Sequence, residues 1–137
     1  MIHVHAIDHV VFRTNNLKAM ISFYVDVLGC HVERELPKES GLVQLRAGNA
    51  LIDLVRFDSI LDKVGADSPS QNGRNVDHIC LQIQPIDKRQ LIGFLIRHGI
   101  EYSKFEQRYG AEGFGESLYI DDPEGDTIEL KPIKHVE

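Results

Sequence analysis

The sequence is poor in the residues that mark several classes of protein. Its 137 residues include no tryptophan, two methionines, five prolines and two cysteines. Cys30 and Cys80 lie among apolar residues and are too few for the disulfide framework of a small secreted domain. The sequence alone does not exclude one disulfide between them. No apolar run is long enough to span a membrane, and residues 1–5 show no signal-peptide pattern. We therefore expect a cytoplasmic protein.

Basic residues are also in the minority. Lysine and arginine number 15 against 21 aspartates and glutamates, which gives a formal net charge of −6, and no basic cluster occurs. Because nucleic-acid binding needs a concentrated basic surface, this composition favours a small-molecule partner. The length, with 42% hydrophobic residues, corresponds to one domain with an ordinary core.

What the sequence does contain is one pattern of elements that occurs twice. Apolar residues at helical spacing run from Asn16 to Leu28 and stop at Gly29, and a second such run over residues 90–98 stops at Gly99. Each helix is followed by three strand-like runs, over 30–36, 41–46 and 50–57 in the first copy and over 100–107, 116–120 and 127–131 in the second. These runs predict two βαβββ modules of the α+β class, at residues 6–57 and 76–132, joined by a connector at 58–75.

Four short phrases place charged or metal-binding side chains inside strand-like runs. Asp8-His9 and Asp77-His78 open the two copies, while Asp53 and Glu129 lie in the phrases Ile-Asp-Leu and Ile-Glu-Leu near their ends. A carboxylate taken out of water is costly unless a cation accompanies it. If these strand faces look inward, the four side chains converge on one metal ion.

The predicted ligand set has two imidazoles and two carboxylates, which suits nickel, cobalt, zinc, manganese or ferrous iron. Each histidine alone is more often a hydrogen-bonded structural residue. The repeated order His9, Asp53, His78, Glu129 is what favours the metal site.

The phrases also resemble those of a known family. Asp8-His9, the helix phrase at 19–29, Asp77-His78 and the phrase at 122–130 together resemble the vicinal oxygen chelate superfamily, which includes lactoylglutathione lyase (glyoxalase), extradiol dioxygenases, fosfomycin thiol transferases and bleomycin-binding proteins. The resemblance covers nearly the whole chain. It implies that the two modules form a cupped, barrel-like mixed sheet with flanking helices, and that the chain forms a homodimer.

The resemblance further implies a ligand set and a reaction. His9, His78 and Glu129 match the metal ligands shared by most enzymes of the superfamily, and Asp53 falls where glyoxalases carry a fourth ligand, usually Glu. Because Asp is one methylene shorter than Glu, the alternative is that Asp53 does not reach the metal and instead accepts a hydrogen bond from one of the groups around the site. The implied activity is that of a lyase or isomerase that moves a proton within a 2-oxoaldehyde–thiol adduct through an enediolate stabilised by the metal, with Glu129 and Asp53 as its catalytic carboxylates.

Other residues are expected to contact the substrate. By resemblance, Arg13 would bind the acidic end of a glutathione adduct, and pairing with a nearby acid is its structural alternative. The glycine-rich segment 108–116 departs from the basic residues that glyoxalases often carry there. We expect a mobile lid in which Arg108, Tyr109 and Phe114 contact substrate, with a plain hairpin as the alternative.

Other functions within the superfamily stay open. With only three ligands the site would suit a fosfomycin-type thiol transferase or a ferrous-iron dioxygenase. A non-catalytic protein that binds a drug or another small molecule is a further alternative. The presence of all four ligand positions counts against such a binder, since those proteins commonly lack the ligands.

Overall fold

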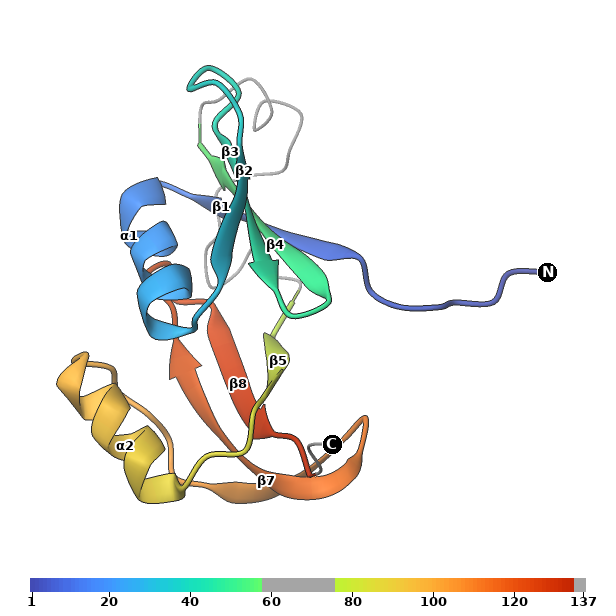
Figure 1. Cartoon of the computed structure of the whole chain (residues 1–137), viewed down its shortest axis with the longest axis vertical. Helices are drawn as coiled ribbons and strands as arrows, with labels where there is room; N and C mark the ends of the chain where they lie inside the picture. Colours follow the sequence, from blue (N-terminus) through green and yellow to red (C-terminus); the bar gives the residue numbers. More distant parts are fainter. Residues whose placement is uncertain (58–75, 135–137) are drawn as a thin grey trace. The chain divides into compact units, whose positions relative to one another are not determined.

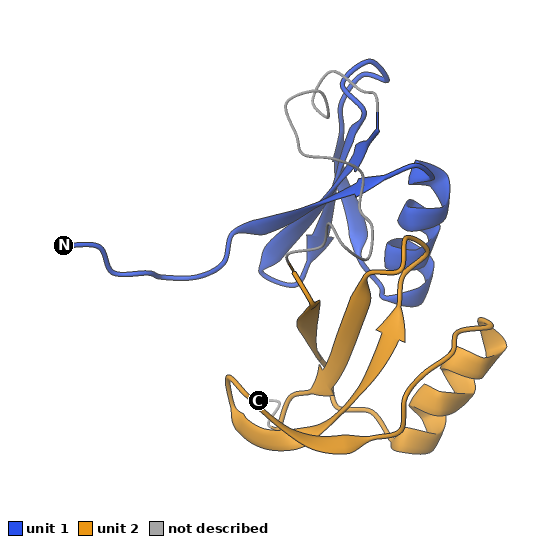
Figure 2. Cartoon of the chain, turned by 180° about the vertical axis from the view of Figure 1, so that it is seen from behind, with its two compact units in different colours: residues 1–74 blue, residues 75–137 orange. Residues whose placement is uncertain are grey.

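The computed structural model describes residues 1–57 and 76–134. The chain divides into two compact units, residues 1–74 and residues 75–137 (Figure 2). They correspond to the two predicted modules, and the predicted connector lies outside the described residues. No helix in the described parts of the chain is long and apolar enough to cross a membrane.

The first unit is a four-stranded mixed sheet with one helical segment (Figure 1). Its strand order is β1-β4-β3-β2, in which β1 and β4 are parallel and the other neighbours are antiparallel. The elements are β1 (His9–Thr14), α1 (Leu17–Ser22) continuing into a π-helical turn η1 (Phe23–Val27), β2 (His31–Glu35), β3 (Leu42–Ala47) and β4 (Ala50–Arg56).

The second unit repeats this order of elements. Its sheet has the order β5-β8-β7-β6, again with the first pair parallel and the others antiparallel. The elements are β5 (His78–Ile83), α2 (Lys88–Arg97), β6 (Glu106–Gly110), β7 (Gly113–Asp121) and β8 (Thr127–Pro132). The predicted α+β class and its two βαβββ modules are confirmed.

Both helical segments begin and end where local chemistry requires. The Asn16 side chain accepts a hydrogen bond from the backbone N–H of Ala19, and the Asp87 carboxylate caps α2 in the same way. Gly29 and Gly99 follow the helices with φ values of 77° and 68°, a conformation that costs glycine little. The stops at Gly29 and Gly99 were therefore readable from sequence, whereas α2 begins at Lys88, two residues before the predicted run over 90–98.

Alternation along the strands separates an apolar face from a polar face in each sheet. In the first unit, one face buries Val43, Leu45, Ile52 and Leu54, and the helical segment contributes Met20, Phe23 and Tyr24 to the core. In the second, the equivalent core contains Leu118, Ile120, Ile128 and Leu130 together with Leu91 and Leu95 of α2. The opposite face of each sheet carries the His and carboxylate predicted as ligands.

The segment 108–116 forms a hairpin, which was the alternative to the predicted mobile lid. Residues 108–110 and 113–115 belong to β6 and β7, which pair as a hairpin around the two-residue turn Ala111–Glu112. The predicted strand at 100–107 begins only at Glu106. Glycines at 110, 113 and 115 suggested a loop because glycine is depleted in strands, yet here they are paired.

Candidate metal site

The two candidate ligand pairs occupy the same register in their sheets. In the first unit Asp53 of β4 lies opposite Val11, two residues beyond His9 on the parallel strand β1. In the second unit Glu129 of β8 lies opposite Cys80, two residues beyond His78 on β5. Each unit therefore brings one imidazole and one carboxylate to one face of its sheet.

In the first unit the carboxylate is buried and only partly satisfied. Asp53 is 5% exposed, and its Oδ2 accepts a hydrogen bond from the Gln44 amide at 3.2 Å. Within the described chain its Oδ1 is buried with no hydrogen-bond partner. A buried carboxylate oxygen without a donor is unfavourable, so this atom is suited to a cation.

The imidazole of His9 is oriented by a hydrogen bond between its Nδ1 and Asp8. Its Nδ1 lies 2.6 Å from the carboxylate of Asp8, and this hydrogen bond is the main cause that raises the pKa of His9, with a smaller contribution from the charge of Asp53. A histidine whose Nδ1 donates to a carboxylate presents Nε2 as a ligand, an arrangement common at metal sites.

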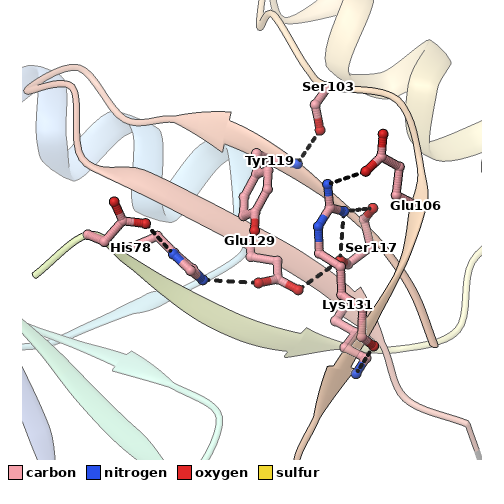
Figure 3. Close-up of polar contacts among 9 residues, drawn as sticks. His78, Ser103, Glu106, Ser117, Tyr119, Glu129 and Lys131 are labelled. Carbon is pink, nitrogen blue, oxygen red and sulfur yellow. Dashed lines mark hydrogen bonds and ion pairs between the residues drawn. The ribbon is translucent and has the colours of Figure 1, made fainter. Parts of the chain in front are cut away.

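In the second unit the pair is in direct contact (Figure 3). His78 repeats the pattern of His9, with Nδ1 2.8 Å from the carboxylate of Asp77. Its Nε2 lies 3.2 Å from Oε1 of Glu129. Glu129 is buried, and its Oε2 accepts a hydrogen bond of 2.7 Å from the hydroxyl of Ser117.

Each pair by itself is chemically suited to a divalent metal. It offers one nitrogen and one oxygen ligand, donor types that borderline or hard divalent ions accept. In neither unit do the described residues bring three His, Cys, Asp or Glu side chains together as a complete metal cluster.

The cysteines take no part in a bridge. Cys30 is buried and Cys80 is exposed, and both are free thiols. Partial desolvation of its sulfur by neighbouring atoms, followed by the charge of Glu129, raises the pKa of Cys80 to about 11. Cys80 is therefore a neutral thiol at neutral pH in the metal-free chain.

The expected substrate-binding residues are placed differently from one another. Arg13 lies on the His9 face, four residues or about 13 Å further along β1, with its guanidinium 4.9 Å from the ring centroid of Phe57. Arg108 shares a face with Glu129, and its guanidinium lies 4.3 Å from the ring centroid of Tyr119.

Tyr109 and Phe114 lie on the other face of the β6–β7 hairpin. They are cross-strand partners, exposed, with ring centroids 5.1 Å apart. Alternation places both on the opposite face from Arg108. The structure thus brings Arg108 to the Glu129 face of its sheet and directs the two aromatic rings away from it.

Sequence reasoning missed the residues that support the carboxylates. Gln44 and Ser117 are polar strand residues whose roles depend on pairing with strands that lie 9 and 12 positions along the chain. The only sequence signal for Gln44 and Ser117 was that each is a polar residue within a strand-like run.

Comparison with known proteins assigns the class of protein to which this fold and site belong. The sequence model of the Glyoxalase/Bleomycin resistance protein/Dioxygenase superfamily matches residues 6–130. The chain therefore belongs to this superfamily, as its motifs predicted.

Solved structures agree with this fold. An integron cassette protein from V. cholerae has 22% sequence identity and a TM-score of 0.75, with 98% of this chain and 99% of that chain covered. Lactoylglutathione lyase from Agrobacterium tumefaciens has 21% identity and a TM-score of 0.68, with 96% of each chain covered. A virulence protein from Salmonella typhimurium has 23% identity and a TM-score of 0.73, with 96% of this chain and 98% of that chain covered. No curated protein sequence matches significantly.

Proposed function

We propose that the protein is a metal-dependent lyase or isomerase of the glyoxalase type. Its ligands would be His9, Asp53, His78 and Glu129. The observation that carries the proposal is the buried Asp53, whose Oδ1 has no hydrogen-bond partner among the described residues. Asp53 occupies the register position in its module that Glu129 occupies in the other. A site with three ligands would not require a buried carboxylate at this position.

The proposed substrate is a small 2-oxoaldehyde joined to a thiol. A bound divalent ion would supply positive charge to the two adjacent oxygens of such a substrate. Glu129 would accept a proton from one substrate carbon and return it to the neighbouring carbon, with the hydrogen bond from Ser117 to Oε2 orienting the carboxylate.

Two other parts of the proposal concern partners. The cationic side chain of Arg13 would bind the acidic end of a glutathione-like thiol. The protein would act as a homodimer, with no nucleic-acid or membrane partner. Asp53 would act as the second carboxylate beside the substrate.

The test begins with metal-free protein loaded separately with nickel, cobalt, zinc, manganese and ferrous iron. We expect at least one metal to support loss of the hemithioacetal of a 2-oxoaldehyde, and His78→Ala and Asp53→Ala to abolish both turnover and stoichiometric metal binding. Asp26→Asn, which removes an exposed acid in the same unit as Asp53, is the matched control and should change neither.

Other outcomes would redirect the assignment. Metal binding that survives Asp53→Ala, without hemithioacetal turnover, would favour the thiol transferase, and oxygen uptake with ferrous iron and a catechol would favour the dioxygenase. Small-molecule binding by a chain that takes up no metal would contradict the enzymatic proposal and favour a drug-binding protein.

A further inference from the structure

The second carboxylate oxygen of Glu129 is engaged by a buried residue outside the ligand set. Ser117 is fully buried and donates its hydroxyl hydrogen to Glu129 Oε2. A hydrogen bond between buried groups, one of them charged, is among the stronger ones in proteins. Ser117 therefore restricts the orientation of the Glu129 carboxylate.

Arg108 donates hydrogen bonds to Ser117 and so influences the orientation of the Ser117 hydroxyl. Its Nη1 donates both to the backbone carbonyl of Ser117 and to the hydroxyl oxygen, the latter at 3.0 Å. A serine hydroxyl has a single hydrogen, so a hydroxyl that accepts from Arg108 has that hydrogen available for Glu129. The ring of Tyr119 and the carboxylate of Glu106 hold the guanidinium in place.

The first unit carries a chain of the same kind. Nη1 of Arg34 donates to the amide oxygen of Gln44 at 3.0 Å, and the amide nitrogen of Gln44 donates to Asp53 Oδ2. Because the amide oxygen is engaged by Arg34, the amide NH₂ is directed to the carboxylate. The intermediate residue differs, Gln in one unit and Ser in the other, but the order arginine, neutral polar residue, carboxylate is the same.

In both units this arrangement leaves one carboxylate oxygen available. Oε1 of Glu129 faces His78 Nε2, and Oδ1 of Asp53 has no donor within the described chain. We propose that Arg108 and Ser117 are positioning residues that hold Glu129 by Oε2 and so present Oε1 beside His78, and that Arg34 and Gln44 do the same for Asp53. The positioning of the carboxylates stands on the hydrogen bonds themselves, while its use for metal ligation rests on the proposed function.

A metal-free double-mutant cycle tests the positioning. Ser117→Ala should lower the folding equilibrium constant about tenfold or more, because it removes a hydrogen bond to a buried charged group. When Glu129→Leu is already present, the effect of the same substitution should be smaller by about tenfold, since no carboxylate remains to be oriented and only the hydrogen bond from Arg108 to the hydroxyl is lost.

Ser103→Ala is the matched control for this cycle. The Ser103 hydroxyl accepts from the backbone N–H of Tyr119 at 2.8 Å, so it contacts a nearby residue of the same strand as Ser117. It has no hydrogen bond to Glu129, and its effect should be the same with and without Glu129→Leu.

Measurements of metal affinity test whether the positioned carboxylates ligate a metal ion. Ser117→Ala should weaken binding of zinc or nickel, measured by calorimetry, about 10- to 100-fold, and Gln44→Leu should do so through Asp53. Arg108→Lys retains the positive charge but loses the forked donation, so it should weaken binding less than Ser117→Ala. The visible spectrum of bound cobalt should change in Ser117→Ala and remain unchanged in Ser103→Ala.

The outcomes separate this inference from the proposed function. A wild-type chain that binds no metal overturns the proposed function, while coupling of tenfold or more between Ser117 and Glu129 still supports the positioning. Coupling of less than about twofold overturns the positioning, whatever the wild-type chain binds. Strong coupling with unchanged metal affinity and cobalt spectrum overturns its role in ligation.

Discussion

The substitution Gly110→Ala tests why the β6–β7 hairpin contains so many glycines. Lys131 is 6% exposed, and its Nζ donates to the backbone carbonyls of Arg108 at 3.0 Å and Gly113 at 2.8 Å. A Cβ atom at position 110 would lie 2.8 Å from this Nζ, and one at Gly115 would lie 3.2 Å from Cε. We infer that these glycines make room for the Lys131 side chain across the hairpin.

The expected cost follows from these contacts. A methyl group at 110 would displace the ammonium group and break at least one of its two hydrogen bonds, each worth about 1.5–3 kcal/mol because the donor is charged. Alanine in place of glycine in a strand returns about 0.5–1 kcal/mol of that loss. Gly110→Ala should therefore lower the free energy of unfolding by about 1–2 kcal/mol, measured by urea denaturation.

The same substitution should behave differently when Lys131→Met is present. Methionine retains most of the stem but has no atom at the position of Nζ, so Gly110→Ala should then be neutral or slightly stabilising. Gly48→Ala is the control, because Gly48 has φ +63° and a Cβ added there would meet no atom within 4 Å, so its cost comes from the backbone alone and should be equal in both backgrounds. An equal cost of Gly110→Ala in both backgrounds would refute the reasoning.

Three further predictions concern other parts of the chain. Asp87→Ala should lower the free energy of unfolding by about 1 kcal/mol in urea denaturation, since Asp87 accepts from the backbone N–H groups of Arg89 and Gln90, and Asp87→Asn should retain most of that stability. Burial raises the pKa of the Cys30 thiol above its ordinary value of 9.0, so the unfolded chain releases this proton first and stability falls as pH rises past that value. Denaturation at a series of pH values should show a smaller decline for Cys30→Ala; an identical decline would contradict this. Asp53→Asn should weaken zinc binding at least about tenfold by calorimetry, and unchanged affinity would place Asp53 outside the ligand set.

Much of the fold could be predicted because its signals are local. The helix start at Asn16 and the stops at Gly29 and Gly99 depend on side chains and φ values within a few residues. The β6–β7 hairpin was predicted only as the alternative to a mobile lid, because its glycines are not typical of strands. Two of its glycines, Gly110 and Gly115, are explained by the side chain of Lys131, which lies in another strand.

The sequence by itself determined which side chains share a strand face. A period of two residues places His9 with Arg13 and Glu129 with Lys131, whatever the neighbouring strands are. Only the tertiary structure decided which strands pair and in what register, and hence that Ser117 would hold Glu129 and that Gln44 would hold Asp53. Strand pairing brings side chains within hydrogen-bonding distance across the sheet. The number of residues between them in the sequence does not indicate that they are in contact.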